Sequence, residues 1–206
     1  MESESAKVEH LHHLDVPPGH LHAIGAISVN FNLLESSFYF LIELFAPSSA
    51  VDYFFWELSN LERLQMLKHF SQSNADEEIA ERVEAASKYF RSCFENRNLL
   101  MHSRLGGISS SELLSLATMK RRGELLFDLP LVTLQRVADE IWIGVEFVAR
   151  LTDYIEQSRQ ALSALIEQAP GAGPRLAQVA RSLPPIPAAP LRLDPTQKVL
   201  KVGVEI

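Results

Sequence analysis

The sequence has a single cysteine, Cys93, so no disulfide can form within one chain. Proteins poor in cysteine are typical of a reducing cytosol, and we therefore expect a cytoplasmic protein. The N-terminus lacks a basic stretch followed by an apolar run, so no secretory signal is predicted. Positive charge is also scarce, because 19 Lys and Arg residues against 26 Asp and Glu residues give a formal charge of −7. This balance argues against binding nucleic acid by bulk electrostatics alone, although it allows a small basic site.

An uninterrupted hydrophobic run of membrane length is likewise absent. Residues 23–46 come nearest, but Asn30, Asn32, Glu35 and Glu43 interrupt them. The centre of a bilayer tolerates such groups poorly, so this segment is predicted to be a buried core helix and no membrane partner is expected. With 206 residues, 47% hydrophobic and 22% charged, the chain suits one globular domain.

Apolar residues recur at helical spacing over most of the middle of the chain. The pattern predicts an all-α, up-and-down bundle of four to five helices over residues 17–168, with a short β-hairpin before the last long helix. The predicted helices cover about 20–45, 59–70, 76–103 and 133–168, and Gly106 and Gly107 are expected to end the third. The hairpin is predicted from 113–119 and 124–129, which flank a Lys-Arg-Arg-Gly turn. Residues 1–16 are predicted to be a flexible polar arm, and 169–206 a flexible proline-rich tail.

An arginine occupies an apolar position near the end of the third predicted helix. On a helical wheel, Arg97 falls in the middle of the hydrophobic stripe that starts at Ile79. A guanidinium in such a place is costly unless it is paired or lies in a wet crevice. Asn98 and His102 belong to a neighbouring polar ridge, and five residues of helix separate Arg97 from His102 by roughly 140°. Either the helix ends between them, or the long arginine side chain closes the gap, or two protomers build one site.

Arginine and histidine together suit metal-free phosphodiester chemistry. A guanidinium offers a fixed positive charge and a planar fork of donors to a phosphate whose negative charge grows in the transition state. An imidazole titrates near neutral pH, so it can take a proton from one hydroxyl and donate one to a leaving oxygen. The pair therefore predicts RNA cleavage with the 2′-hydroxyl as the nucleophile, without a metal or another cofactor.

The segment Arg97-Asn98-Leu99-Leu100-Met101-His102 resembles the signature of HEPN domains, in which four to six residues separate an arginine from a histidine and a polar residue commonly follows the arginine. The resemblance extends to the helical bundle over roughly residues 20–165. It implies a homodimer whose two signatures meet at a shared cleft. In active branches it also implies a metal-independent endoribonuclease, often a toxin with an antitoxin or a component of antiviral defence. Arg97 would position the scissile phosphate, His102 would be the acid and base, and Asn98 would orient both.

Other interpretations of the same residues stand beside this one. Glu35 could pair with Arg97 and make it purely structural. His102 could cap the helix C-terminus, and Asn98 could hydrogen-bond to it. Many domains with this signature only assemble, or bind RNA, a nucleotide or a protein partner, so a non-catalytic dimeric module is the main alternative.

Four further groups of residues attract attention in the sequence. The histidines at 10, 12, 13, 20 and 22 suggest a metal site, but no ligand set at familiar spacing completes it, and no metal is predicted. Lys120–Arg122 at the hairpin tip could contact RNA phosphates, although an ordinary solvated turn is favoured. The aromatic residues 53–56 and Trp142 are interpreted as core or dimer interface.

Overall fold

The computed structural model describes residues 16–46, 57–110, 113–120, 123–168 and 182–196. Within these ranges the chain forms four helices and one three-stranded sheet. In chain order they are α1 (Pro18–Phe45), α3 (Asn60–Asn74), α4 (Glu77–Met101), β1 (Arg104–Ser110), β2 (Leu113–Lys120), β3 (Gly123–Pro130) and α5 (Leu131–Gln168). The prediction of an all-α bundle with a hairpin before the last long helix is confirmed.

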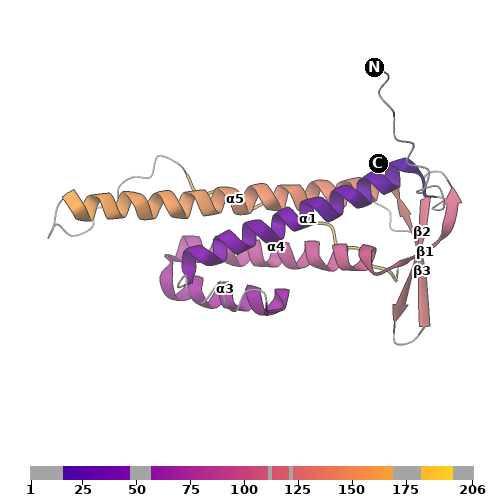
Figure 1. Cartoon of the computed structure of the whole chain (residues 1–206), viewed down its shortest axis with the longest axis horizontal. Coiled ribbons are helices and arrows are strands. Elements are labelled where there is room, and N and C mark those ends of the chain that lie inside the picture. The colour runs from indigo at the N-terminus through magenta and orange to yellow at the C-terminus, as the bar shows by residue number, and fades with distance from the viewer. Residues whose placement is uncertain (1–15, 47–56, 111–112, 121–122, 169–181, 197–206) are drawn as a thin grey trace, which may run out of the picture.

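The helices lie lengthwise and the sheet stands across one end of them (Figure 1). Helix α1 packs along α5, α4 lies beneath them, and α3 packs on α4. The sheet joins the end of α4 to the start of α5, so the residues at 97–102 lie where the bundle meets the sheet. No helix in the described part of the chain is both long and apolar enough to cross a membrane.

Local signals in the sequence set the helix starts. Helix α1 begins with proline in its first turn, where the missing N–H would have no intrahelical partner. Ser59 caps α3 through a capping box, because its hydroxyl accepts from the Glu62 N–H and the Glu62 carboxylate accepts from the Ser59 N–H. Asp76 caps α4 by accepting from the Ile79 N–H at 2.8 Å. These caps confirm the predicted starts of α3 and α4.

The sheet has a strand that the sequence interpretation missed. Strands β2 and β3 form the predicted antiparallel hairpin, with Leu116 opposite Phe127. Strand β1 pairs with the other edge of β2, and it contains the two glycines that were expected to end α4. The pairing shifts between Leu105 and Gly107, as a β-bulge requires, so Gly106 lies at a bulge. Helix α4 already ends at Met101, and the prediction that these glycines terminate it is wrong.

The core consists mainly of aromatic and branched side chains from α1, α4 and α5. Phe31 and Phe38 of α1 contact the ring of Phe90 on α4, with ring centroids 5.4 and 4.6 Å apart. Helix α5 approaches α4 closely at Gly144, where an added Cβ would lie 2.8 Å from the Tyr89 ring. A glycine is therefore needed at this crossing. The apolar stripe predicted for the last helix is buried at 137, 141, 148, 151 and 155.

Residues 182–196, which we call the strap, lie extended against the bundle. Leu193 and Pro184 are buried, and the strap hydrogen-bonds to side chains of α4 and α5. The prediction of a flexible tail over 169–206 is therefore wrong for these residues. Proline-rich backbone cannot pair with itself in a helix or hairpin, but here side chains of the bundle satisfy its polar groups. The predicted polar arm lies outside the described residues except for Val16, which is buried.

Candidate functional site at the end of α4

Helix α4 is unbroken from Arg97 to the residue before His102. It runs to Met101, and His102 is its C-cap, with the His102 N–H donating to the Asn98 carbonyl at 3.0 Å. The helix therefore ends between Arg97 and His102, but only at the last position before the histidine, and the backbone bond to Asn98 keeps the helical spacing up to His102. Since the helical geometry holds, the two side chains leave the helix roughly 140° apart. Among the described residues of one chain, no hydrogen bond or ring contact joins them.

Arg97 points toward α1 and is only partly exposed. Its Cζ lies 5.7 Å from the centroid of the Phe31 ring, which is within the range of a cation–π contact. Its NH1 donates to the Asn98 side-chain oxygen at 3.1 Å. Its Nε is buried and has no hydrogen-bond partner in the described part of the chain. The guanidinium thus keeps donors that the fold itself does not use.

The carboxylate expected to neutralise Arg97 lies elsewhere. Glu35 accepts a hydrogen bond from the Asn60 side chain at 2.9 Å, and Asn60 in turn accepts from Arg63 at 3.0 Å. Within the described residues, no acidic oxygen lies within 4.0 Å of the Arg97 guanidinium. The interpretation of Arg97 as half of an ion pair with Glu35 is wrong. Helical spacing placed both residues near the core, but it could not show that Asn60 of α3 reaches Glu35 first.

His102 and Asn98 differ in how the fold holds them. His102 is exposed and follows the last turn of α4, where unpaired carbonyl groups favour a cation. Asn98 accepts from Arg97, so its side chain is engaged with the arginine of the signature and not with the histidine. The backbone bond between Asn98 and His102 is the ordinary helical one. The structure thus joins Arg97 to Asn98 and leaves the His102 side chain exposed to solvent.

Asn96, the residue just before Arg97, holds the strap against α4. Its side chain is 2% exposed, and its Nδ2 donates to the Leu191 carbonyl at 2.5 Å while its Oδ1 accepts from the Leu193 N–H at 2.9 Å. Glu140 of α5 accepts from the Leu191 N–H at 2.7 Å. A single asparagine therefore satisfies a donor and an acceptor of an extended backbone, as a neighbouring β-strand would. Sequence analysis missed this role, although the alternating leucines at 191 and 193 were a signal for an extended segment.

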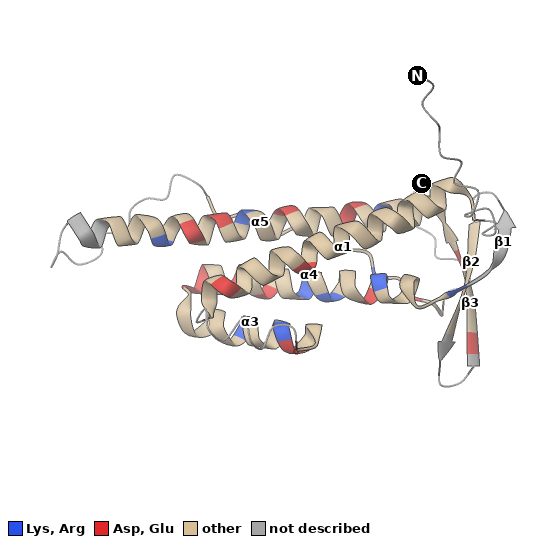
Figure 2. Ribbon diagram, in the orientation of Figure 1, with Lys and Arg blue, Asp and Glu red and all other residues tan. Residues whose placement is uncertain are grey.

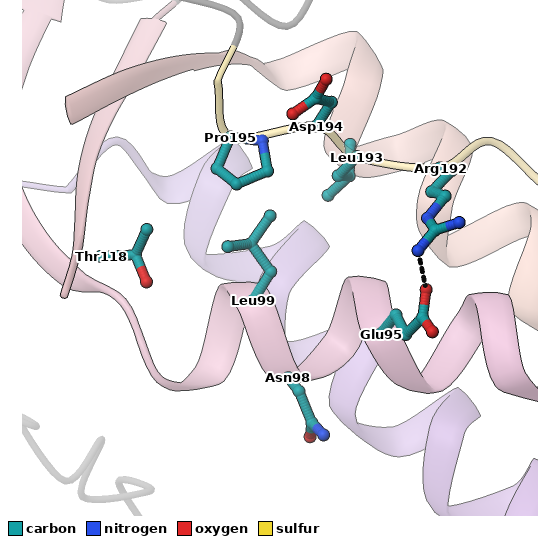
Figure 3. Close-up of a pocket in the computed structure, with 8 residues that line it drawn as sticks. All are labelled: Glu95, Asn98, Leu99, Thr118, Arg192, Leu193, Asp194 and Pro195. Atoms are coloured by element: carbon teal, nitrogen blue, oxygen red, sulfur yellow. Dashed lines mark ion pairs between the residues drawn. The ribbon is translucent and has the colours of Figure 1, made fainter. Parts of the chain in front are cut away.

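The strap also brings a new arginine to the site. Arg192 bonds to Glu95 at 2.8 Å (Figure 3). Arg91 reaches the same carboxylate at 3.2 Å. Figure 3 shows Glu95 and Leu99 directed toward the strap, whereas Asn98 points to the other side of α4. Both arginines are largely exposed, so each pair contributes little to stability.

A pocket of about 760 Å³ lies between the strap, the end of α4 and strand β2. Glu95, Asn98 and Leu99 line it from α4, Thr118 from β2, and residues 192–195 from the strap. It holds charges of both signs, which matches the mixture of acidic and basic residues along the helices in Figure 2. Among the described residues, the arrangement gives no broad basic surface. Any phosphate would have to be recognised by individual arginines.

The buried thiol and phenol beside the strap are not reactive groups. Burial, followed by the nearby Glu140 carboxylate, raises the pKa of Cys93 to about 12. The pKa of Tyr89 is also raised, chiefly by burial, and its hydroxyl donates to the Glu140 carbonyl at 2.6 Å. Both groups stay protonated near neutral pH and contribute to packing.

The other candidates are dispersed or lie outside the described residues. His20 is buried, with no hydrogen-bond partner in the described residues at either ring nitrogen, whereas His22 is exposed. Among the described residues, no three His, Cys, Asp or Glu side chains are grouped so that they could hold a metal. The arm histidines 10, 12 and 13, the aromatic residues 53–56 and the hairpin-tip arginines 121 and 122 lie outside the described residues. Trp142 is exposed, so its interpretation as core is wrong.

No protein-family model matches the chain, and neither the curated proteins nor the solved structures contain a match.

Proposed function

We propose that the protein is a metal-independent endoribonuclease of the HEPN type, which acts as a homodimer through Arg97, Asn98 and His102. The observation that carries this proposal is that Arg97 has no carboxylate partner among the described residues. An arginine that sits at the edge of a core without a structural ion pair retains its full charge for a phosphate. His102 is exposed one turn further along the chain, so both groups are available to a bound RNA.

The chemistry follows from the two groups. Arg97 binds the non-bridging oxygens of the scissile phosphate and stabilises the charge that develops on them. His102 removes the proton of the 2′-hydroxyl, whose oxygen attacks phosphorus, and the bond to the 5′-oxygen breaks as the protonated His102 donates that proton to the leaving oxygen. Asn98 holds the guanidinium through its side-chain oxygen, 3.1 Å from NH1. The products are a 2′,3′-cyclic phosphate and a free 5′-hydroxyl.

The angular separation of Arg97 and His102 is the reason to include a second copy. Since the two side chains leave one helix in different directions, a twofold arrangement that brings two α4 ends together lets each arginine work with the histidine of the partner. A test is cleavage of RNA in EDTA by the wild type, Arg97→Ala, His102→Ala, and a co-expressed mixture of these two variants. Both single variants should be inactive. The mixed dimer should regain part of the activity, because one of its two composite sites is intact.

Exposed residues of the same two types, elsewhere on α4 and α3, provide matched controls. Arg91→Ala removes an exposed arginine of α4, and His69→Ala removes an exposed histidine of α3. Both should cleave like the wild type. Cleavage by Arg97→Ala at the wild-type rate, or a dimeric wild type that cleaves no RNA across varied sequences, would refute the ribonuclease.

A non-catalytic module is the second candidate, and two observations favour it. Within a single chain the structure does not bring Arg97 and His102 into contact, and the formal charge of −7 weakens nonspecific RNA binding. In that case the protein should bind RNA or a nucleotide without cleaving it. Arg97→Ala should then reduce binding, whereas His102→Ala should leave it unchanged.

A further inference from the structure

A groove runs between the C-terminal half of α1 and the middle of α5, and we call it the α1–α5 groove. Its apolar surface comes from Phe40 and Leu44 of α1 and from Ala149 of α5. On a helical wheel, Phe40 and Leu44 lie roughly 120–180° from Phe31 and Phe38, which face α4. The groove is therefore on the opposite side of α1 from the candidate site at the end of α4.

The spacing of the lining residues matches the surface of a helix. On α1 they are residues 37, 40, 43 and 44, and on α5 residues 149, 152, 153 and 156, so neighbours three or four positions apart recur in both sets. These are intervals of three and four residues, which form the ridges between which another helix packs. The two helices start from the same end of the bundle, so their ridges run side by side along the groove. A helical occupant fits this geometry better than an extended one.

The groove presents apolar surface to solvent. Phe40 is 56% exposed, and Val29 and Leu33 continue the exposed apolar surface of α1 toward its N-terminus. Trp142 of α5 is also exposed, two helical turns before Ala149. Contiguous exposed apolar residues of this kind mark sites of protein interaction.

The charged residues that line the groove are all acidic. Glu43, Asp153 and Glu156 line the groove, are exposed, and form no ion pair with the described residues. No lysine or arginine is among the lining residues. Arg159 lies next to the groove, where its guanidinium donates to the Leu44 carbonyl and lies over the Phe45 ring.

We infer that the α1–α5 groove binds an amphipathic helix of a partner protein whose apolar stripe is flanked by lysine or arginine. The apolar stripe would cover Phe40 and Leu44, and the flanking cations would face the three carboxylates. A second copy of this chain is a poor occupant, since it would bring an equally acidic rim against this one. This inference does not depend on the ribonuclease, because it uses none of the residues at 97–102.

The test uses the full chain and a designed peptide of about 18 residues, or ~27 Å of helix. The peptide is built from leucine, alanine and lysine, with leucines on one face and lysines flanking them, and a matched peptide has glutamate at every lysine. Fluorescence anisotropy should show binding of the lysine peptide and at least tenfold weaker binding of the glutamate peptide. The triple variant Glu43→Gln, Asp153→Asn, Glu156→Gln should weaken binding of the lysine peptide about tenfold, and Phe40→Ala should weaken it by a similar factor.

A triple variant with the same change in charge elsewhere is the control: Glu81→Gln, Glu84→Gln, Asp139→Asn. It should bind the lysine peptide like the wild type. If both triple variants lost affinity for the lysine peptide equally, the binding would reflect general attraction to an acidic protein. That result would overturn the inference. Equal binding of the two peptides would also overturn it. The last measurement is the oligomeric state of the wild type and of Phe40→Asp by sedimentation. A wild-type dimer that Phe40→Asp converts to a monomer would assign the groove to a second copy of this chain.

Discussion

Replacing Asn96 with alanine is expected to release the strap from the bundle. The side chain is 2% exposed and makes two hydrogen bonds to the strap backbone, at 2.5 and 2.9 Å. Each bond contributes about 0.5–1.5 kcal/mol, and a buried partner left unsatisfied costs about 1–3 kcal/mol. The free energy that favours the docked strap should therefore fall by roughly 2–4 kcal/mol. That loss shifts the equilibrium between docked and undocked strap by about thirtyfold or more, since 1.4 kcal/mol corresponds to a factor of ten.

Hydrogen exchange measures this equilibrium directly. In Asn96→Ala, the amides of Leu191 and Leu193 should exchange at least thirtyfold faster than in the wild type, while amides in the middle of α5 keep their protection. The global free energy of unfolding should fall by less than the loss in the strap, because an undocked strap recovers its hydrogen bonds from water.

Arg192→Ala is the control for the same segment. It removes only an ion pair in which the arginine is 74% exposed, so it should cost at most about 1 kcal/mol. Unchanged protection of Leu191 and Leu193 in Asn96→Ala would refute the reasoning. Equal effects of the two variants would also refute it, because they would show that the buried amide contributes no more than a surface charge.

Three further outcomes are expected. Gly144→Ala should destabilise the fold by about 1–3 kcal/mol in urea unfolding, because the new methyl group meets the buried ring of Tyr89 at 2.8 Å; an unchanged midpoint would contradict this contact. Burial raises the pKa of the Cys93 thiol from 9.0 to about 12, so the native state favours the protonated form. The free energy of unfolding should therefore fall as the pH rises from about 9 toward 12. Unfolding curves measured across this pH range should show a smaller fall for Cys93→Ala. Arg97→Ala should lower the free energy of unfolding by about 0.5–2 kcal/mol, which is the contribution of a cation–π contact with Phe31. A decrease of about 3–5 kcal/mol in thermal unfolding would instead indicate a buried ion pair.

The helices and the hairpin were predictable because their signals are local. Ser59 with Glu62, and Asp76 before two glutamates, mark helix starts by short-range hydrogen bonds. The third strand was not predictable in the same way. Its glycines also suit a helix end, and only the pairing with β2 shows that one of them serves a bulge.

The candidate site was predictable residue by residue but not as an arrangement. The wheel placed Arg97 on an apolar stripe, and the structure does place it at the edge of the core over Phe31. The wheel could not show that Glu35 bonds to Asn60, nor that Asn96 faces the strap, because both contacts join segments far apart in the chain. The high proline content of the strap led to the prediction of a flexible tail, whereas leucines in the same segment pack against the bundle.

The strap also determines the order in which the molecule can be completed. Leu193 bonds to a side chain 97 positions earlier, and the Leu191 N–H bonds to one 51 positions earlier. Contacts over such separations form after local ones, since the loop must close before they contribute. During synthesis, α4 and α5 emerge before the strap, so Asn96 and the seat of Leu193 stay open until the strap has been made. A nascent chain therefore passes through a stage in which its helices are present but the site that Leu193 fills is empty. Any extended segment with alternating leucines can compete for that site during this stage.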